Sequence, residues 1–258
     1  MLGERAKRTR PDLKCCPMAA DTKHPLFVQP PDTNAKVWRY MDFTNYIWTL
    51  ECSALYFSRI DLLGDPFEGT TTAASNAAIM KLMDWPPGSE QTQKDWSETN
   101  AKVRRDVRRG IFVNCWHMND HESEAMWRLY ATTDQAIAIQ TSYSRLVDAL
   151  DPTIIIGAVR YTDYDDAVFP TSNALWPAAH KRLSFKHENE IRALKFAMDD
   201  SNEPLGHGVS VNLANLVERV YVSPSRPSWY EKLAERLTRR FGYSFPIIKS
   251  RLSEQPVR

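Results

Sequence analysis

The sequence has little glycine and no glycine-rich phosphate loop. Its 258 residues include 16 prolines but only 9 glycines, and neither a GxxxxGK[ST] nor a GxGxxG pattern occurs. In proteins that carry these patterns, backbone N–H groups approach the phosphates of a nucleotide closely. Their absence argues against P-loop proteins and against Rossmann dinucleotide-binding proteins.

Long apolar runs, paired cysteines and a strong net charge are also missing. Apolar runs such as 154–156 are far too short to span a bilayer, and the first twenty residues lack the apolar core of a secretory signal. The cysteines at positions 15, 16, 52 and 115 form no CxxC pair, which favours a reduced, cytoplasmic compartment. With a formal net charge of +1, overall charge gives no reason to expect a membrane or nucleic-acid partner.

The chain is long enough for one domain with a sizeable core, since 43% of its residues are hydrophobic and 25% are charged. Residues 1–33 mix basic residues with five prolines, so we expect a disordered or loosely attached basic arm there. Residues 34–258 are expected to form a single domain. Strands and helices intermix without regular βαβ spacing, which predicts an α+β fold with a mixed, mostly antiparallel sheet and packed helices.

Residue periodicity predicts the individual elements. Strands are expected at 36–43, 55–58, 111–118, 135–141, 152–164 and 217–222. Helices are expected at 44–54, at 73–109 with an interruption at 85–88, at 120–131 after a cap at Asn119, at 142–150 and at 228–241. A helix or turn is expected at 180–184.

The segment FKHENEIRALKF, residues 185–196, places Glu188, Glu190 and Arg192 at alternate positions. In a strand these side chains share one face, about 7 Å apart. Two carboxylates in a partly desolvated cleft repel, while Arg192 keeps one of them ionised, which suits a general base or a group that stabilises a cation. In a helix, Glu188 and Arg192 would form only a solvated i,i+4 ion pair. The pattern alone leaves both structures open.

Three other patterns have both a functional and a structural interpretation. His117 and His121 could bind a metal from one helix face, but the expected helix starts between them. The stretch KVRRDVRR at 102–109 carries five cations able to meet phosphates, although no aromatic residue is interleaved for stacking and a solvated face is the simpler interpretation. Asp65 and Glu68 follow a strand in DLLGDPFEG, as in a binding loop or an ordinary turn.

Several stretches resemble one family when they are taken in order. They are KVWRYMDF, LYFSRIDLLGDPFEG, CWHMNDHESEAMWRLYA with QAIAIQT, VRYTDY, KRLSFKHENEIRAL and VERVYVSPS. Together they resemble the uncharacterised, mainly bacterial family called domain of unknown function 2971, over about residues 36–250. The sequence departs from the family pattern at Gly64, Ala138 and Ile191, where the pattern has Asn, Gly and Trp.

The layout of that family is similar to the ADP-ribosyltransferase-like fold, in its DNA- and RNA-modifying toxin branch. The resemblance implies an NAD-dependent enzyme of a bacterial toxin or phage-defence system, with a nucleic-acid or protein acceptor and an antitoxin or defence-system partner. Carried over by position, Glu190 is the catalytic glutamate with Glu188 beside it, and Arg39 grips the ribose or phosphate of NAD. The other implied cofactor contacts are Tyr56, Phe57, Arg192, Asp65, Glu68 and Trp127.

The implied chemistry is coherent, because loss of nicotinamide leaves a ribosyl cation that an anionic carboxylate stabilises. Two alternatives remain. In a metal-dependent nuclease, Asp65, Glu68, Glu188 and Glu190 would hold Mg²⁺. In a non-catalytic binding or sensor module of a defence system, the same acids would form structural ion pairs.

Overall fold

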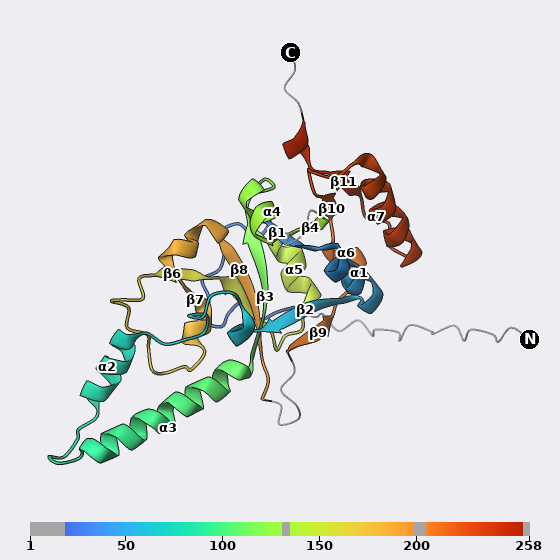
Figure 1. Cartoon of the computed structure of the whole chain (residues 1–258). Helices are drawn as coiled ribbons and strands as arrows, with labels where there is room; N and C mark the ends of the chain where they lie inside the picture. The colour runs from blue at the N-terminus through green and yellow to red at the C-terminus, as the bar shows by residue number, and fades with distance from the viewer. Residues whose placement is uncertain (1–18, 131–134, 199–204, 255–258) are drawn as a thin grey trace, which may run out of the picture.

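The computed structural model describes residues 19–130, 135–198 and 205–254, and it has the expected α+β architecture (Figure 1). The strands are β1 (Lys36–Asp42), β2 (Ala54–Arg59), β3 (Ile111–Met118), β4 (Ala136–Ser142), β5 (Ile155–Ala158), β6 (Arg160–Thr162), β7 (His180–Arg182), β8 (Glu190–Phe196), β9 (Gly206–Ser210), β10 (Arg219–Val222) and β11 (Ile247–Lys249). The α-helices are α1 (Phe43–Cys52), α2 (Ala73–Leu82), α3 (Glu90–Arg109), α4 (Glu124–Tyr130), α5 (Tyr143–Ala149), α6 (Leu213–Leu216) and α7 (Ser228–Arg240). Short 3₁₀ turns include η2 (Trp176–Ala179) and η3 (Leu183–Glu188).

Strand β3 organises the main sheet, which is mostly antiparallel. One edge of β3 pairs with β8 from Ile111 to His117. The other edge pairs with β2 near Val113 and with β1 near His117. Because β1 and β2 share one edge of β3, the sheet forks between them. One branch continues from β1 through β4 and β10 to β11, and the other runs from β2 to β9.

Polar side chains occupy the fork. Arg39 donates from Nη1 to the carbonyl oxygen of Cys115 at 3.1 Å and from Nη2 to that of Tyr56 at 3.2 Å. Asn114 donates from Nδ2 to the same Tyr56 oxygen at 2.9 Å. These bonds satisfy carbonyl groups at the point where the strands part and the regular ladder stops.

The two faces of the sheet are covered differently. The largest apolar core lies on the face of Val37, Phe57 and Trp116, where helices α1, α5, α6 and α7 pack. The opposite face carries Trp38 and Val113, and two smaller apolar clusters cover it. Helix α4 packs in one of them, and the segment around η2 packs in the other. The candidate site described below lies between these two covers.

Helices α2 and α3 project from the body of the molecule as an arm (Figure 1). Helix α3 has 20 residues and no buried side chain, and α2 buries only Ser75. An interruption at 85–88 separates the two helices as expected. None of the described helices is both long and apolar enough to cross a membrane.

The segment at 185–196 divides at Asn189. Residues Leu183–Glu188 form a 3₁₀ turn, Asn189 adopts a left-handed conformation with φ of 39°, and Glu190–Phe196 form β8. The strand structure is therefore correct for Glu190 and Arg192, which share a face. Glu188 precedes the strand, so the expected row of three side chains on one strand is wrong.

Three further boundaries differ from expectation. Helix α4 begins at Glu124 rather than near Asn119, and the hydroxyl of Ser123 accepts from the Met126 N–H at 3.4 Å. The long strand expected at 152–164 breaks at Val159, and β6 beyond it pairs with β7 in a separate sheet. Residues 180–182 are strand β7, because they pair with β6.

The expected basic arm at 1–33 is described only from residue 19 onwards. In this part Leu26 is fully buried and Phe27 is 5% exposed. The N–H of Ala20 also donates to the carbonyl of Val147 at 2.9 Å. Residues 19–33 are thus packed against the domain, and residues 1–18 lie outside the described part of the chain.

Candidate active site

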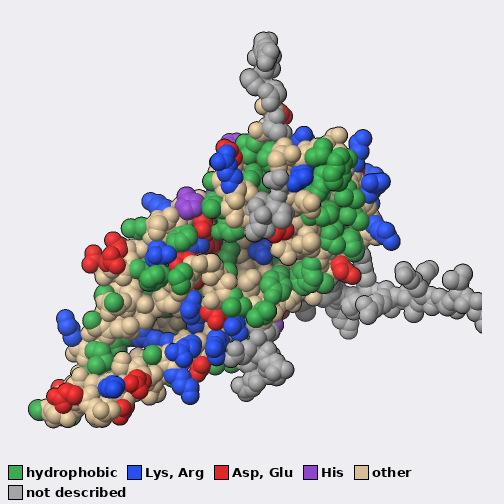
Figure 2. Space-filling model, viewed as in Figure 1, with side chains coloured by type: hydrophobic (Ala, Val, Ile, Leu, Met, Phe, Trp, Pro, Cys, Tyr) green, Lys and Arg blue, Asp and Glu red, His purple; other side chains and the backbone are tan. Residues whose placement is uncertain are grey.

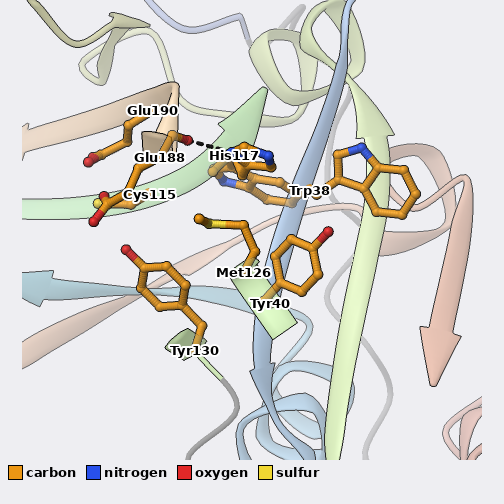
Figure 3. A pocket seen from close by; sticks show the side chains of 9 residues that line it. Trp38, Tyr40, Cys115, His117, Met126, Tyr130, Glu188 and Glu190 are labelled. Atoms are coloured by element: carbon orange, nitrogen blue, oxygen red, sulfur yellow. Dashed lines mark hydrogen bonds between the residues drawn. The ribbon is translucent and has the colours of Figure 1, made fainter. Parts of the chain in front are cut away.

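A small pocket lies on the sheet face between α4 and η3. Strands β1, β3 and β8 contribute its floor, and Tyr130 at the end of α4 lies at one side (Figure 3). Its volume is about 40 Å³, which holds about two or three water molecules. A ring-sized ligand therefore requires a side chain to move, and Tyr130, at 42% exposure, is the least enclosed. The lining residues are Trp38, Tyr40, Cys115, Trp116, His117, Met126, Tyr130, Glu188 and Glu190.

Five charged side chains at one edge of this pocket form what we call the ionic cluster: Glu68, Lys181, Glu188, Glu190 and Arg192. The ammonium of Lys181 lies 3.0 Å from Glu68 Oε1, 2.5 Å from Glu188 Oε2 and 3.2 Å from Glu190 Oε2. Arg192 donates from Nε to Glu190 Oε1 at 2.6 Å and from Nη2 to Glu68 Oε2 at 3.0 Å. All five side chains are at least nine-tenths buried.

Three members of the ionic cluster, Lys181, Glu190 and Arg192, favour one another's charged forms. Burial raises the pKa of the Glu190 carboxyl, but Arg192 and Lys181 outweigh burial and bring that pKa down to about 2. Burial lowers the pKa of Lys181 and of Arg192, and the neighbouring carboxylates more than reverse this, so both pKa values are raised. Three carboxylates and two cations leave a net charge of −1 beside the pocket.

Lys181 occupies the point that the three carboxylates share, which is where a divalent cation would have to bind. Among the described residues, no group of three or more His, Cys, Asp or Glu side chains is placed to hold a metal ion. The geometry therefore gives no support to a magnesium site built from Glu68, Glu188 and Glu190.

Glu188 and Glu190 are bonded to different extents. Both oxygens of Glu190 accept hydrogen bonds from Arg192, and Lys181 and the Cys115 thiol add to these. Glu188 accepts from Lys181 through Oε2, and no described residue donates to its Oε1. Of the two carboxylates, Glu188 is the one with an acceptor atom left for a ligand.

His117 lies in the pocket lining on strand β3, and His121 is not part of that lining, so the two histidines do not share a helix face. The Nδ1 of His117 is 2.5 Å from the carbonyl oxygen of Glu188. Because a carbonyl only accepts, Nδ1 carries the hydrogen and Nε2 is left as an acceptor. That Nε2 is buried without a partner among the described residues. Burial lowers the pKa of His117 despite the backbone hydrogen bond, which favours the neutral ring.

The structure brings some of the predicted site residues together. Glu68, Glu188, Glu190 and Arg192 meet in the ionic cluster, although Glu68 is more than a hundred residues from the others. Asp65 is held by Arg182, with 2.7 Å between Asp65 Oδ1 and Arg182 Nη2. His117 lies directly opposite Glu190 in the pairing of β3 with β8. This position beside the ionic cluster can be recognised only when the strand register is known.

Other predicted residues lie outside the pocket lining. By strand alternation, the Arg39 side chain projects from the face opposite Trp38, where it donates to carbonyl groups at the fork of the sheet. Phe57 is fully buried in the large core, and Tyr56 packs edge-on against Trp48 at 5.5 Å between ring centroids. Trp127 packs behind the pocket, edge-on to Tyr40 at 5.0 Å, and donates to Glu122.

No protein-family model and no curated protein matches the chain, so the resemblance to domain of unknown function 2971 stays a prediction. Among solved structures, the chain is similar to DarT of Thermus sp. 2.9 in complex with carba-NAD⁺, with a TM-score of 0.40 and 8% identity over 86% of this chain and 97% of that one. A second structure, the same DarT in complex with ADP-ribosylated ssDNA, gives a TM-score of 0.39 and 10% identity over 87% and 97%. Identities this low transfer no residue role to this chain.

Proposed function

We propose that the chain is an NAD-dependent ADP-ribosyltransferase-like enzyme that reacts in the pocket over β1, β3 and β8. The observation that carries this proposal is that the carboxylates Glu188 and Glu190 line one pocket together with the aromatic rings of Trp38, Tyr40 and Tyr130, with Tyr130 nearest the carboxylates (Figure 3). Aromatic faces and carboxylates together suit a flat cation. The nicotinamide ring of NAD⁺ is such a cation.

The same charges suit the bond-breaking step. When the bond between the ribose C1′ and the nicotinamide nitrogen breaks, its electron pair leaves with neutral nicotinamide and positive charge develops on the ribose. A fixed negative charge beside C1′ stabilises that charge. Arg192 and Lys181 keep Glu190 ionised for this purpose, and Glu188 Oε1 accepts the proton or hydrogen bond of the attacking nucleophile.

His117 contributes to recognition in this proposal. Its ring lines the pocket, and its Nε2 is a buried acceptor without a partner among the described residues. The carboxamide of nicotinamide has two N–H donors, and a buried acceptor that stays empty costs about 1–3 kcal/mol. An N–H of the carboxamide satisfies His117 and fixes the ring against the carboxylates.

The wider setting follows from the same proposal. A macromolecule, nucleic acid or protein, receives the ADP-ribose, as in a toxin or phage-defence effector of the bacterial cytoplasm. An antitoxin or another defence-system component would restrain the activity.

The test is release of nicotinamide from labelled NAD⁺ in the presence of cell lysate. We expect the wild type to release nicotinamide, with transfer of label to one class of macromolecule. Glu188→Gln and Glu190→Gln should each lower the rate about 10²- to 10³-fold, whereas Glu235→Gln on α7, an exposed i,i+4 partner of Arg239, should not. Folded wild-type protein that releases no nicotinamide and transfers no label contradicts the proposal.

A non-catalytic module is the second candidate, because both cations and all three carboxylates of the ionic cluster have partners within it. In that case Glu190→Gln lowers the melting temperature and changes no turnover, since the cluster only joins the loop at 65–69 to the sheet. Measuring both quantities on one preparation separates the two candidates.

A further inference from the structure

A second, larger cavity lies along the α2–α3 arm, and we call it the arm groove. Its volume is about 610 Å³, and helix α2, helix α3 and the segment 169–177 line it. Three arginines, Arg104, Arg105 and Arg108, are among its lining residues, and no aspartate or glutamate is among them. In the space-filling view, Lys and Arg side chains gather around the base of the arm (Figure 2).

No carboxylate neutralises the three arginines among the described residues. Arg104 donates to the side-chain oxygens of Asn76 at 2.6 Å and Asn100 at 3.2 Å, which are neutral amides. Burial lowers the pKa of Arg104, with no opposing effect from an acid. Arg108 bonds only backbone carbonyl groups, and Arg105 bonds no described residue. The groove therefore holds fixed positive charge that is complementary to an anion.

An aromatic side chain completes the lining. Trp96 precedes Arg104 by eight residues on α3, which is a little over two helical turns. It packs edge-on against Trp85, with ring centroids 6.1 Å apart, and Trp85 is held by a 3.0 Å bond from Nε1 to the Met80 carbonyl. The basic stretch at 102–109 contains no aromatic residue. The stacking surface comes from Trp96, which lies earlier in the same helix.

We propose that the arm groove binds a single strand of nucleic acid. The phosphates lie on Arg104, Arg105 and Arg108, and a base stacks on Trp96. Cations that track a backbone and an aromatic platform for bases are the two components of sequence-tolerant single-strand binding. A cavity of 610 Å³ has room for about two nucleotides. An acidic peptide would meet the cations but has no need of the tryptophan.

The arm groove is directly joined to the candidate active site. Arg108 donates from Nε to the carbonyl oxygen of Glu68 at 2.6 Å. The carboxylate of the same Glu68 lies 3.0 Å from Lys181 and 3.0 Å from Arg192 in the ionic cluster. A strand bound on Arg108 is therefore separated from the rest of the ionic cluster by Glu68, which contacts Arg108 and both cations of the cluster. That this strand is the acceptor of ADP-ribose rests on the proposed function, whereas its binding does not.

The experiment measures fluorescence anisotropy of a labelled single-stranded oligonucleotide with the full chain, without NAD⁺. We expect Arg105→Glu and Trp96→Ala each to weaken binding about tenfold or more. The matched control is Arg240→Glu, an exposed arginine at the end of α7, which makes the same charge change away from the groove and should leave affinity within about twofold.

Two outcomes overturn the proposal. One is equal weakening by Arg105→Glu and Arg240→Glu, which means that only net charge matters. The other is displacement of the oligonucleotide by an acidic phosphopeptide at equal concentration, which assigns the groove to a peptide. Glu188→Gln should bind the oligonucleotide like the wild type. Wild-type protein that binds the oligonucleotide but releases no nicotinamide would contradict the proposed function alone. Wild-type protein that releases nicotinamide but binds no oligonucleotide in the groove would contradict the groove alone.

Discussion

The arginines of the ionic cluster and those of the arm groove differ in what neutralises them. Arg192 is fully buried and bonds two glutamates, so its charge is neutralised inside the protein. Arg104, Arg105 and Arg108 bond amides, carbonyl groups or no described residue, so their charge remains available. Burial with a counter-ion fixes a structure, and partial burial without one prepares a surface for an anionic partner. The predictions below test this contrast, from the largest expected effect to the smallest.

Arg192→Met should destabilise the protein most. The substitution leaves the buried carboxylates of Glu68 and Glu190 with Lys181 as their remaining cation, and breaking a buried ion pair from one side costs about 3–5 kcal/mol. Urea unfolding followed by circular dichroism measures this loss. The matched change Arg105→Met in the arm groove should cost less than about 0.5 kcal/mol. Equal losses would show that the two sets of arginines do not differ as described.

The second-largest effect should be a loss of protein stability when acid protonates Glu190 in the ionic cluster. The pKa of Glu190 is about 2 in the folded protein, below its ordinary value of 4.5. The stabilisation is therefore fully present above about pH 4.5 and is lost as the pH falls towards 2, by about 3 kcal/mol for a lowering of this size. Melting temperatures between pH 6 and pH 3 measure it. Glu190→Gln should flatten the acid side of this profile, and an unchanged profile would contradict the assignment.

His117→Phe should have a smaller and more selective effect. It removes the buried Nε2 acceptor of a ring that lines the pocket and keeps a ring of similar size. We expect KM for NAD⁺ to rise about tenfold, a cost of about 1.4 kcal/mol, with partial recovery in His117→Gln. Oligonucleotide binding in the arm groove should stay unchanged. If KM is unaffected, His117 does not contact the cofactor.

The sequence was a good guide to local structure. Alternation in KVWRYMDF predicted β1, and the bulky apolar residues of IFVNCWHM predicted β3. Both strands bury consecutive residues, because both faces of the sheet are covered. The strand interpretation of ENEIR correctly placed Glu190 and Arg192 on one face. It failed for Glu188, because the left-handed Asn189 turns the chain just before the strand, and no periodicity signals that turn.

The candidate site was less predictable, because its contacts join distant segments. Lys181 lies on a short strand that forms only by pairing with β6, and nothing nearby in sequence marks it as the partner of Glu68. His117 becomes visible as a pocket residue only through its register with Glu190. The positive charge of the arm groove is available because no carboxylate lies beside Arg104 among the described residues. The sequence of helix α3 shows its own charges but not which residues of other segments pack against it.

Because the sheet forks, both of its branches pair with strand β3. β1 and β2 each pair with it over a short register of two residues, and the side chains of Arg39 and Asn114 span the opening. The chain continues from β2 into the arm, while the other branch carries Trp38 and Tyr40 of the pocket. Helix α3 of the arm also runs directly into β3, and Arg108 bonds the Glu68 carbonyl, so a movement of the arm reaches the pocket through a strand of its floor and through the ionic cluster.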